Sequence, residues 1–395
     1  MSGNQREMQR RERREKKDKR NKLIIWIGIG IVFVLLVVLK ICEININSVK
    51  DYFTDENGNF SVTDGVTEDN FPYSIDASQD VNIVNLNNRL GILTPNSFTV
   101  LDGKKANVDY FFEHGYSNPI LAASGIYSLV YDQGDNNYRL DTVSEAVYEE
   151  ESPNAIFCAD VSKTGVVALA TTSKDKLCDI TVLSKSLDEK FNVSLSDGFV
   201  VDIAISDNSK QVSAAVVNSV DAQLVTKVYT YDINSDGTVF KEVVLPASTL
   251  VDINCVGNDI WAVGSDYLGI IKGDEYKEIY THGSINTECY SYNQSEELVL
   301  AYGDYNNSTD YVVSYIKPSG KIKNEINVNA LVKDVCATTS VISVLTTDEI
   351  INYNLKNGKE KSRLSTTDSV KSICVLGSQV YIHKQSIIDK GGNVN

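Results

Sequence analysis

The segment DINSDGT, which runs from position 232 to 238, is the clearest short motif for chemistry in this chain. Oxygen-bearing side chains recur there at every second position, as in the opening of a calcium-binding loop; they are Asp232, Asn234 and Asp236. A complete loop ends on a carboxylate at its twelfth position, where this chain has Val243, with Glu242 one residue out of register. Because Asn-Ser-Asp-Gly is also good hairpin-turn chemistry, we expect a polar turn and leave calcium binding as an open alternative.

Other residues that often take part in catalysis are sparse and scattered. The three histidines, His114, His282 and His383, fall in different parts of the chain without zinc-ligand spacing. The sequence contains neither a nucleophile elbow of the form G-x-S-x-G nor a phosphate-binding Walker loop. Carboxylate pairs for glycoside hydrolysis are too numerous for the sequence to single one out. We therefore expect no enzyme activity, no cofactor and no metal site.

The cysteines recur in a pattern that favours packing over redox chemistry. Cys42 follows an apolar segment, and six others lie further along the chain: Cys158, Cys178, Cys255, Cys289, Cys336 and Cys374. Five of these six, all except Cys178, occupy the same strand in different repeat units. Such a position asks for a small apolar side chain, which a free thiol resembles. We expect buried, reduced thiols, although cysteines outside the cytoplasm can also pair as disulfides.

The N-terminus indicates where the rest of the chain is positioned. Residues 1–22 hold ten Lys/Arg against four Asp/Glu, and the seventeen residues from Leu23 to Leu39 carry no charge. A helix of that length spans about 26 Å, close to a hydrocarbon core once the flanking lysines snorkel. Trp26 lies near the basic end, where an indole favours the membrane interface. We predict a transmembrane helix over 23–40 with residues 1–22 as a cytoplasmic tail, rather than a cleaved signal peptide.

The chain beyond this helix is expected to lie outside the cytoplasm, and it is acidic. The whole chain has a formal net charge of −16, and leaving out the tail and Lys40 makes it about −23. Such a charge argues against nucleic acid or an anionic membrane surface as the partner. Residues 41–80 are rich in acidic and small polar residues and have few apolar runs, so we interpret them as a stalk.

From residue 81 onward, short runs rich in Val, Ile, Tyr and Thr alternate with polar turns, which predicts strands joined by hairpins. Fresh first strands recur about every 41 residues, near Val81, Pro119, Ala155, Phe199, Leu250, Ile285, Leu331 and Val370. A period of about 40–45 residues with four strands per unit is typical of a β-propeller. We predict an all-β, WD40-like or quinoprotein-like propeller over 81–395 with eight blades, seven being the alternative.

The last repeat unit leaves room for only about three strands before Asn395. A strand from residues 58–76 would complete this blade and close the ring, which removes an open sheet edge. A pair of β-sandwiches would explain the strand content of the chain but not its repeat period.

Several segments are similar to one known family. They are FPYSID, YSNPILAASGIYSLVYDQGDNNYRLDT, DVSKTGVVALATTS and FVVDIAISDNSKQVSAAVV, which begin at Phe71, Tyr116, Asp160 and Phe199. Through them the chain resembles an uncharacterised clostridial family that is classed only as a domain of unknown function. The resemblance implies a shared plan of a basic cytoplasmic tail, one membrane span and a propeller-like exterior. It implies no known activity.

Together these features predict a single-pass membrane protein whose extracytoplasmic propeller binds another cell-envelope protein as a non-catalytic scaffold or adaptor. The alternative is a module that binds cell-wall glycans, or an enzyme that acts on them, through one mouth of the ring. A sensor that signals to the tail ranks third. Six tyrosines of the sixth unit either form a binding face or pack within strands; they are Tyr290, Tyr292, Tyr302, Tyr305, Tyr311 and Tyr315. Carboxylates and tyrosines clustered in one mouth would favour the glycan alternative.

Overall fold

The computed structural model of this chain describes residues 70–76, 80–281, 286–304, 309–367 and 369–394. These residues belong to one compact unit, Asp69–Asn395. The predicted tail, the predicted span from Leu23 to Leu39 with Trp26, and most of the predicted stalk lie outside the described residues. Within the described ranges, no helix is long and apolar enough to cross a membrane.

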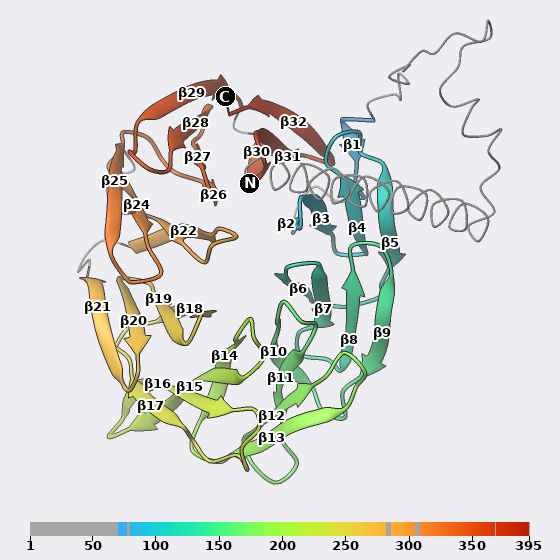
Figure 1. Ribbon diagram of the computed structural model, residues 1–395, viewed down its shortest axis with the longest axis vertical. Coiled ribbons are helices and arrows are strands. Elements are labelled where there is room, and N and C mark those ends of the chain that lie inside the picture. The colour runs from blue at the N-terminus through green and yellow to red at the C-terminus, as the bar shows by residue number, and fades with distance from the viewer. Residues whose placement is uncertain (1–69, 77–79, 282–285, 305–308, 368, 395) are drawn as a thin grey trace, which may run out of the picture. The chain divides into compact units, whose positions relative to one another are not determined.

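The described residues form 32 strands in eight four-stranded antiparallel sheets. The sheets stand as blades in a ring, with the first strand of each blade innermost and the fourth outermost (Figure 1). The predicted eight-bladed propeller is therefore confirmed, and each first strand expected from the repeat period begins within a few residues of an observed one.

The strands of blades 1 to 4 follow one another along the chain. Blade 1 contains β2 (Asn82–Leu86), β3 (Arg89–Leu93), β4 (Ser97–Asp102) and β5 (Val108–Glu113). Blade 2 contains β6 (Pro119–Ser124), β7 (Tyr127–Asp132), β8 (Asn137–Thr142) and β9 (Ala146–Glu151). Blade 3 contains β10 (Ile156–Val161), β11 (Val167–Thr172), β12 (Cys178–Leu183) and β13 (Glu189–Leu195). Blade 4 contains β14 (Phe199–Ile205), β15 (Gln211–Val220), β16 (Gln223–Asp232) and β17 (Lys241–Val244).

Blades 5 to 7 continue in the same way. Blade 5 contains β18 (Leu250–Val256), β19 (Asp259–Gly264), β20 (Tyr267–Lys272) and β21 (Glu275–Thr281). Blade 6 contains β22 (Asn286–Tyr292), β23 (Leu298–Gly303), β24 (Tyr311–Ile316) and β25 (Ile322–Val328). Blade 7 contains β26 (Asp334–Ala337), β27 (Val341–Leu345), β28 (Glu349–Asn354) and β29 (Glu360–Ser365).

Blade 8 takes its strands from both ends of the unit. Its inner three strands are β30 (Val370–Leu376), β31 (Gln379–Lys384) and β32 (Ile387–Asn393). Its outer strand is β1 (Tyr73–Ser74), in which Tyr73 lies opposite Ile388 of β32. A strand from within residues 58–76 thus closes the ring, and the two ends of the unit meet in one sheet.

The hydrophobic core lies between blades rather than at one centre. Eight clusters of buried apolar side chains among the described residues each join two neighbouring blades. Inner strands such as β11, with the sequence VALATT, are buried on both faces and are therefore apolar along nearly their whole length. Outer strands such as β29, with the sequence EKSRLS, expose a polar face to solvent. This division explains why the short apolar runs of the sequence recur with the blade period.

Blade 4 differs from the other blades in the length of its central hairpin. β15 and β16 have 10 residues each, whereas the other described strands have seven or fewer. β14 pairs with β15 only as far as Val217, so residues 218–220 pair with β16 alone. We call residues 218–225 the arm, which extends about 10 Å beyond its neighbours. The end of the ring from which it projects, where the first strand of every blade begins, is called the arm face.

Candidate functional site: the central channel and the arm face

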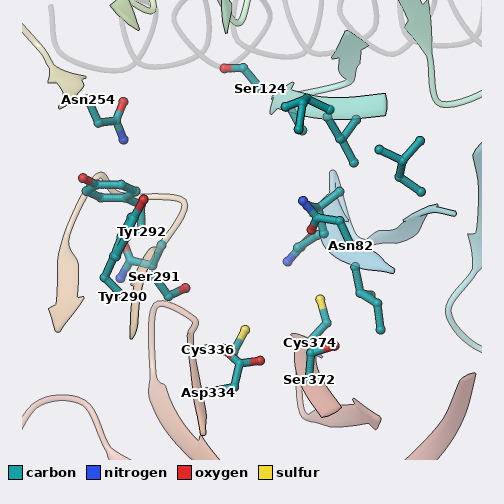
Figure 2. Close-up of a pocket in the computed structure, with 18 of the residues that line it drawn as sticks. Asn82, Ser124, Asn254, Tyr290, Ser291, Tyr292, Asp334, Cys336, Ser372 and Cys374 are labelled. Atoms are coloured by element: carbon teal, nitrogen blue, oxygen red, sulfur yellow. The ribbon is translucent and has the colours of Figure 1, made fainter. Parts of the chain in front are cut away.

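The central channel is lined by residues of the innermost strands of all eight blades and has a volume of about 1420 Å³. Figure 2 shows side chains of its wall, which include many polar groups: Asn82, Ser124, Asn254, Tyr290, Ser291, Tyr292, Asp334, Cys336, Ser372 and Cys374. A cavity of this size exceeds what a small ligand needs and is wide enough to hold water. The innermost strands therefore line a cavity whose wall mixes polar and apolar side chains.

Aspartates in the first strands connect neighbouring blades. One carboxylate oxygen of each accepts a backbone N–H from the next blade: Ile205 to Asp160 at 2.8 Å, Ile253 to Asp202 at 2.7 Å and Ile373 to Asp334 at 2.8 Å. The other oxygen accepts the N–H of the residue that follows the aspartate in its own strand. Because both oxygens of each group are occupied by backbone donors, these carboxyls serve the contact between blades rather than a ligand.

Burial inside the ring changes the ionisation of these aspartates. Desolvation raises the pKa of Asp160 to about 7 and that of Asp334 to about 6, and the backbone N–H bonds offset only part of this rise. Desolvation, with the charge of Asp252 added to it, raises the pKa of Asp202 well above its ordinary value. Each of these carboxyls therefore releases its proton at a higher pH than an exposed aspartate does.

Asp252 of blade 5 interacts with two tyrosines of blade 6. The Tyr292 hydroxyl donates a hydrogen bond to Oδ2 of Asp252 at 2.7 Å. The rings of Tyr290 and Tyr292 meet edge to face, with centroids 5.8 Å apart. Desolvation raises the pKa of Asp252 to about 6 despite the phenolic donors. This carboxyl and the two phenols form a group of polar, aromatic and titratable side chains, and both tyrosines reach the channel wall.

A second charged group lies at the end of the channel opposite the arm face. Lys163, in the turn between β10 and β11, forms ion pairs with Asp207 of the next blade and, at 3.5 Å, with Glu296 of blade 6. Glu296 also accepts the N–H of Gly257, in a turn of blade 5, at 3.0 Å. These contacts join the tight turns of four consecutive blades along one side of the channel mouth.

β-Bulges in the first strands determine which side chains border the arm face. The pairing register shifts at one residue in five of these strands: Phe157, Val201, Val251, Glu288 and Lys371. At a bulge, the side chain of the extra residue departs from the regular alternation of side chains along the strand. The bulge residues of blades 3 to 5 are apolar, and those of blades 6 and 8 are charged. The rim of the arm face is therefore apolar on the side that carries the arm.

Apolar side chains are exposed on and around the arm. Near its tip, Val220 is 45% exposed and Leu224 is 72% exposed. Phe199, at the start of β14, and the bulge residues Val201 and Val251 are also about half exposed. We call these five residues the arm surface. Asp197 is exposed in the loop before β14 and Asp221 in the turn at the arm tip, so the arm surface has acidic neighbours.

The segment DINSDGT forms the expected polar turn between β16 and β17. The carboxylate of Asp232 accepts the N–H of Asn234 at 2.8 Å, and that of Asp236 accepts the Thr238 hydroxyl at 2.6 Å. Both carboxylates thus stabilise the turn itself. Within the described ranges, no group of three or more His, Cys, Asp and Glu is arranged to hold a metal ion.

The remaining residues singled out in the sequence are dispersed. His114 stacks against Tyr116 with ring centroids 4.9 Å apart, His383 is buried against the carbonyl of Gln385, and His282 lies outside the described residues. The three tyrosines Tyr302, Tyr311 and Tyr315 are buried in strands, whereas Tyr305 lies outside the described residues. The sixth-unit tyrosines therefore divide between strand packing and the channel wall.

The six cysteines of the propeller are free thiols in this structure. Cys158, Cys178 and Cys374 are buried, and Cys255, Cys289 and Cys336 are half-buried. The recurrent cysteines do fall in innermost strands, as the repeat pattern predicts, while Cys178 begins the third strand of its blade. Cys255, Cys336 and Cys374 reach the channel wall.

Sequence reasoning missed two features, although both leave a trace in the sequence. The inter-blade aspartates interrupt the apolar first-strand runs AIFCADVS, FVVDIAIS and LVKDVCATT, where a lone carboxylate needs a structural partner. The arm is indicated by the unusual spacing between Gln211 and Asp232, which exceeds that of a hairpin made from six-residue strands.

A closed ring of eight four-stranded blades, with its central channel and projecting hairpin, defines this chain as a WD40-like β-propeller. The C-terminal WD40 domain of Sif2 superposes with a TM-score of 0.57 at 11% identity, covering 80% of this chain and 96% of that one. Saccharomyces cerevisiae Sqt1 gives a TM-score of 0.55 at 8% identity, covering 81% and 97%. KlAtg21, solved in a complex with the coiled-coil of AgAtg16, gives 0.50 at 12% identity, covering 74% and 99%. At such identities the likeness concerns the fold alone.

In sequence, the chain belongs to the family of unknown function DUF5711, which matches residues 67–390. No curated protein matches the chain in sequence.

Proposed function

We propose that this chain is a non-catalytic scaffold or adaptor of the bacterial cell envelope. Its predicted N-terminal helix over 23–40 anchors it in the membrane, and its extracytoplasmic propeller binds another envelope protein through the arm surface. The observation that carries the binding function is the arm itself, because its exposed apolar residues add nothing to the core of their own blade. Exposed apolar side chains gathered on one face are typical of protein-interaction sites.

The backbone of the arm favours a partner that binds in an extended conformation. Residues 218–220 lie beyond the ladder with β14, and residues 223–225 lie beyond the ladder with β17. Both edges of the arm therefore present peptide groups to which another strand can bond, while Val220 and Leu224 offer apolar contacts. The neighbouring carboxylates of Asp197 and Asp221 favour Lys or Arg beside the apolar residues of the partner.

Two further observations support a binding role over catalysis. The aspartates of the channel wall that look most suited to acid–base chemistry accept backbone hydrogen bonds with both oxygens. The chain also shares its fold with KlAtg21, whose structure contains a bound coiled-coil segment of another protein. That comparison supports the class of activity and leaves the partner of this chain to be identified by experiment.

The test is a crosslinking enrichment of the full-length chain in its native host, read by quantitative mass spectrometry. Val220→Ser combined with Leu224→Ser removes the apolar tip of the arm. The matched control is Val239→Ser combined with Phe240→Ser, an apolar pair that is also exposed and lies in the β16–β17 turn at the opposite end of the blade. We expect one envelope protein to be retained by the wild type and the control but depleted at least tenfold by the arm variant. Equal enrichment of the partner with the arm variant and the control would show that the arm does not bind it.

A second candidate function is binding of a cell-wall glycan in the channel. It is favoured by the grouping of Asp252, Tyr290 and Tyr292, because aromatic faces and carboxylates are common sugar contacts. The glycan would have to reach Tyr290 and Tyr292 from the channel. Titration of the full-length chain with soluble peptidoglycan fragments, with Tyr290→Ala as the comparison, distinguishes this candidate from the adaptor. Saturable binding that Tyr290→Ala abolishes and the arm variant leaves intact would favour the glycan.

A further inference from the structure

Two cysteines of neighbouring blades lie together on the channel wall. Cys336 belongs to β26 of blade 7 and Cys374 to β30 of blade 8, and both thiols line the channel (Figure 2). The two strands are held in fixed register by the bond from Ile373 N–H to Asp334 at 2.8 Å. Two residues further along, the N–H of Val375 donates to Sγ of Cys336 at 3.3 Å. Cys336 therefore lies against the backbone beside Cys374.

The Cys336 thiol influences the ionisation of Cys374. The contact with the Cys336 thiol is the largest influence on Cys374 and, together with burial, raises the pKa of Cys374 well above its ordinary value. Neither thiol is part of a disulfide in this structure. The two cysteines lie in the first strands of neighbouring blades, and a disulfide between them requires Cα atoms within about 7 Å of each other.

Another cysteine pair of the propeller provides a natural comparison. Cys158 and Cys178 lie in β10 and β12 of one blade, and β11 separates these strands. Two strand spacings amount to about 9.5 Å, beyond what a disulfide can bridge without backbone movement. Cys178 instead donates its thiol to the carbonyl of Gly198 and accepts the N–H of Val200. Proximity across the channel wall thus sets Cys336 and Cys374 apart from this pair.

We propose that Cys336 and Cys374 form a dithiol site that small-molecule disulfides entering the channel convert to an inter-blade disulfide bond. Cys336 is the more exposed of the two thiols, so its sulfur attacks the small disulfide first and forms a mixed disulfide, releasing one small thiol. The sulfur of Cys374 then attacks the Cys336 sulfur and releases the second small thiol. The two protein thiols lose two electrons and two protons in total, and the small disulfide is reduced to two thiols.

The new bond would join the blade that closes the ring to its neighbour. Blade 8 contains both β1 and β32, so it is the place where the ring can open at the chain ends. A bond between β26 and β30 fixes blade 8 to blade 7 from the inner side, while β1 fixes its outer edge. Oxidation would therefore stabilise the packing of blade 8 against blade 7, on the side of blade 8 that faces away from the contact with blade 1.

The experiment uses the full-length chain incubated with oxidised glutathione and then digested with trypsin without reduction. Lys356, Lys359, Lys361, Arg363 and Lys371 lie between the two cysteines, so trypsin places them on separate peptides. We expect one disulfide-linked pair of peptides containing Cys336 and Cys374, a loss of two alkylatable thiols, and a rise of about 5 °C in the unfolding midpoint. Dithiothreitol should reverse all three changes.

Single variants test the assignment. Cys336→Ser and Cys374→Ser should each abolish the linked peptides and the rise in the midpoint, whereas Cys158→Ser should leave both unchanged. The proposal is overturned if the wild type yields no Cys336–Cys374 peptide, or if other cysteines link to the same extent. The linked peptide is measured on the wild-type chain, so the test remains decisive even if a serine variant fails to fold.

Discussion

The carboxylate of Asp160 in β10 accepts a hydrogen bond from the backbone N–H of Ile205 in β14 at 2.8 Å, across the boundary between blades 3 and 4. The same arrangement recurs between blades 4 and 5 and between blades 7 and 8. A buried polar contact of this kind adds to the apolar packing between neighbouring blades. The hydrogen bond from a first-strand aspartate to the next blade therefore recurs along the inner wall of the ring. Its contribution to stability and its dependence on pH can both be tested.

Removing one inter-blade carboxylate should destabilise the propeller. Asp334→Ala leaves the N–H of Ile373 without its acceptor, which should lower the free energy of unfolding by about 1–3 kcal/mol. Asp348→Ala, at an exposed loop position of the same blade, should change it by less than about 0.5 kcal/mol. Urea unfolding followed by circular dichroism measures both. An Asp334→Ala variant as stable as the control would show that the bond contributes nothing to the closed ring.

The stability of the propeller should fall as pH rises through the range in which the channel carboxyls titrate. The pKa of Asp160 is about 7 in the folded chain, above the ordinary value of an unfolded aspartate, so folding takes up a proton between these pH values. Stability is greatest below the unfolded pKa and declines up to about pH 7, by at most about 1.4 kcal/mol per pH unit for each such carboxyl.

The measurement is the urea midpoint of unfolding at intervals from pH 4.5 to 8. Asp160→Asn, which cannot ionise, should flatten the slope relative to the wild type. An Asp160→Asn slope as steep as that of the wild type would assign the pH dependence to other groups.

A buried ion pair at the boundary of blades 1 and 2 should matter far more than an exposed one. Arg139 pairs with Asp141 at 2.9 Å, and the Asp141 side chain has no exposed surface. Arg139→Gln leaves that carboxylate with the Tyr110 hydroxyl but without its cationic partner and should cost about 3 kcal/mol of stability. Arg363→Gln breaks pairs with Glu349 and Glu360 that are substantially exposed and should cost less than about 1 kcal/mol. Chemical denaturation measures the free energy of unfolding of both variants. Equal losses of stability would contradict the prediction that the buried pair contributes more than the exposed one.

Gly165 occupies a turn where a side chain has no room. Its φ is +79°, and a Cβ there would lie 2.8 Å from ring carbons of Tyr127. Gly134 has a similar φ of +90° but no heavy atom within 4 Å of a built Cβ. Gly165→Ala should therefore lower the thermal midpoint clearly more than Gly134→Ala, since both variants share the backbone strain of about 1 kcal/mol and only the first adds the clash. Matching losses would mean that the Tyr127 ring moves aside freely.

The repeat period of the sequence is sufficient to predict the blades, because each first strand must be a short apolar run that recurs with the sheet. Val370 and Phe199 illustrate this, as both open a first strand in the structure at the predicted position. The candidate site is less predictable from sequence. The approach of Cys336 to Cys374 depends on the spacing of two blades, and the exposure of Leu224 depends on where β14 and β17 stop pairing. Neither the approach of the two cysteines nor the exposure of Leu224 follows from a local sequence pattern, because both depend on how the strands and blades pack in the folded ring.

The measurement that tests the adaptor function most directly is site-specific photocrosslinking from the arm in native host cells. A photoreactive amino acid replaces Leu224 at the arm tip or, as the control, Phe240 at the opposite end of the blade. The account predicts a discrete adduct with one protein from position 224 and none from position 240. Adducts of equal yield from both positions, or from neither, would contradict the proposal that this propeller binds its partner through the arm.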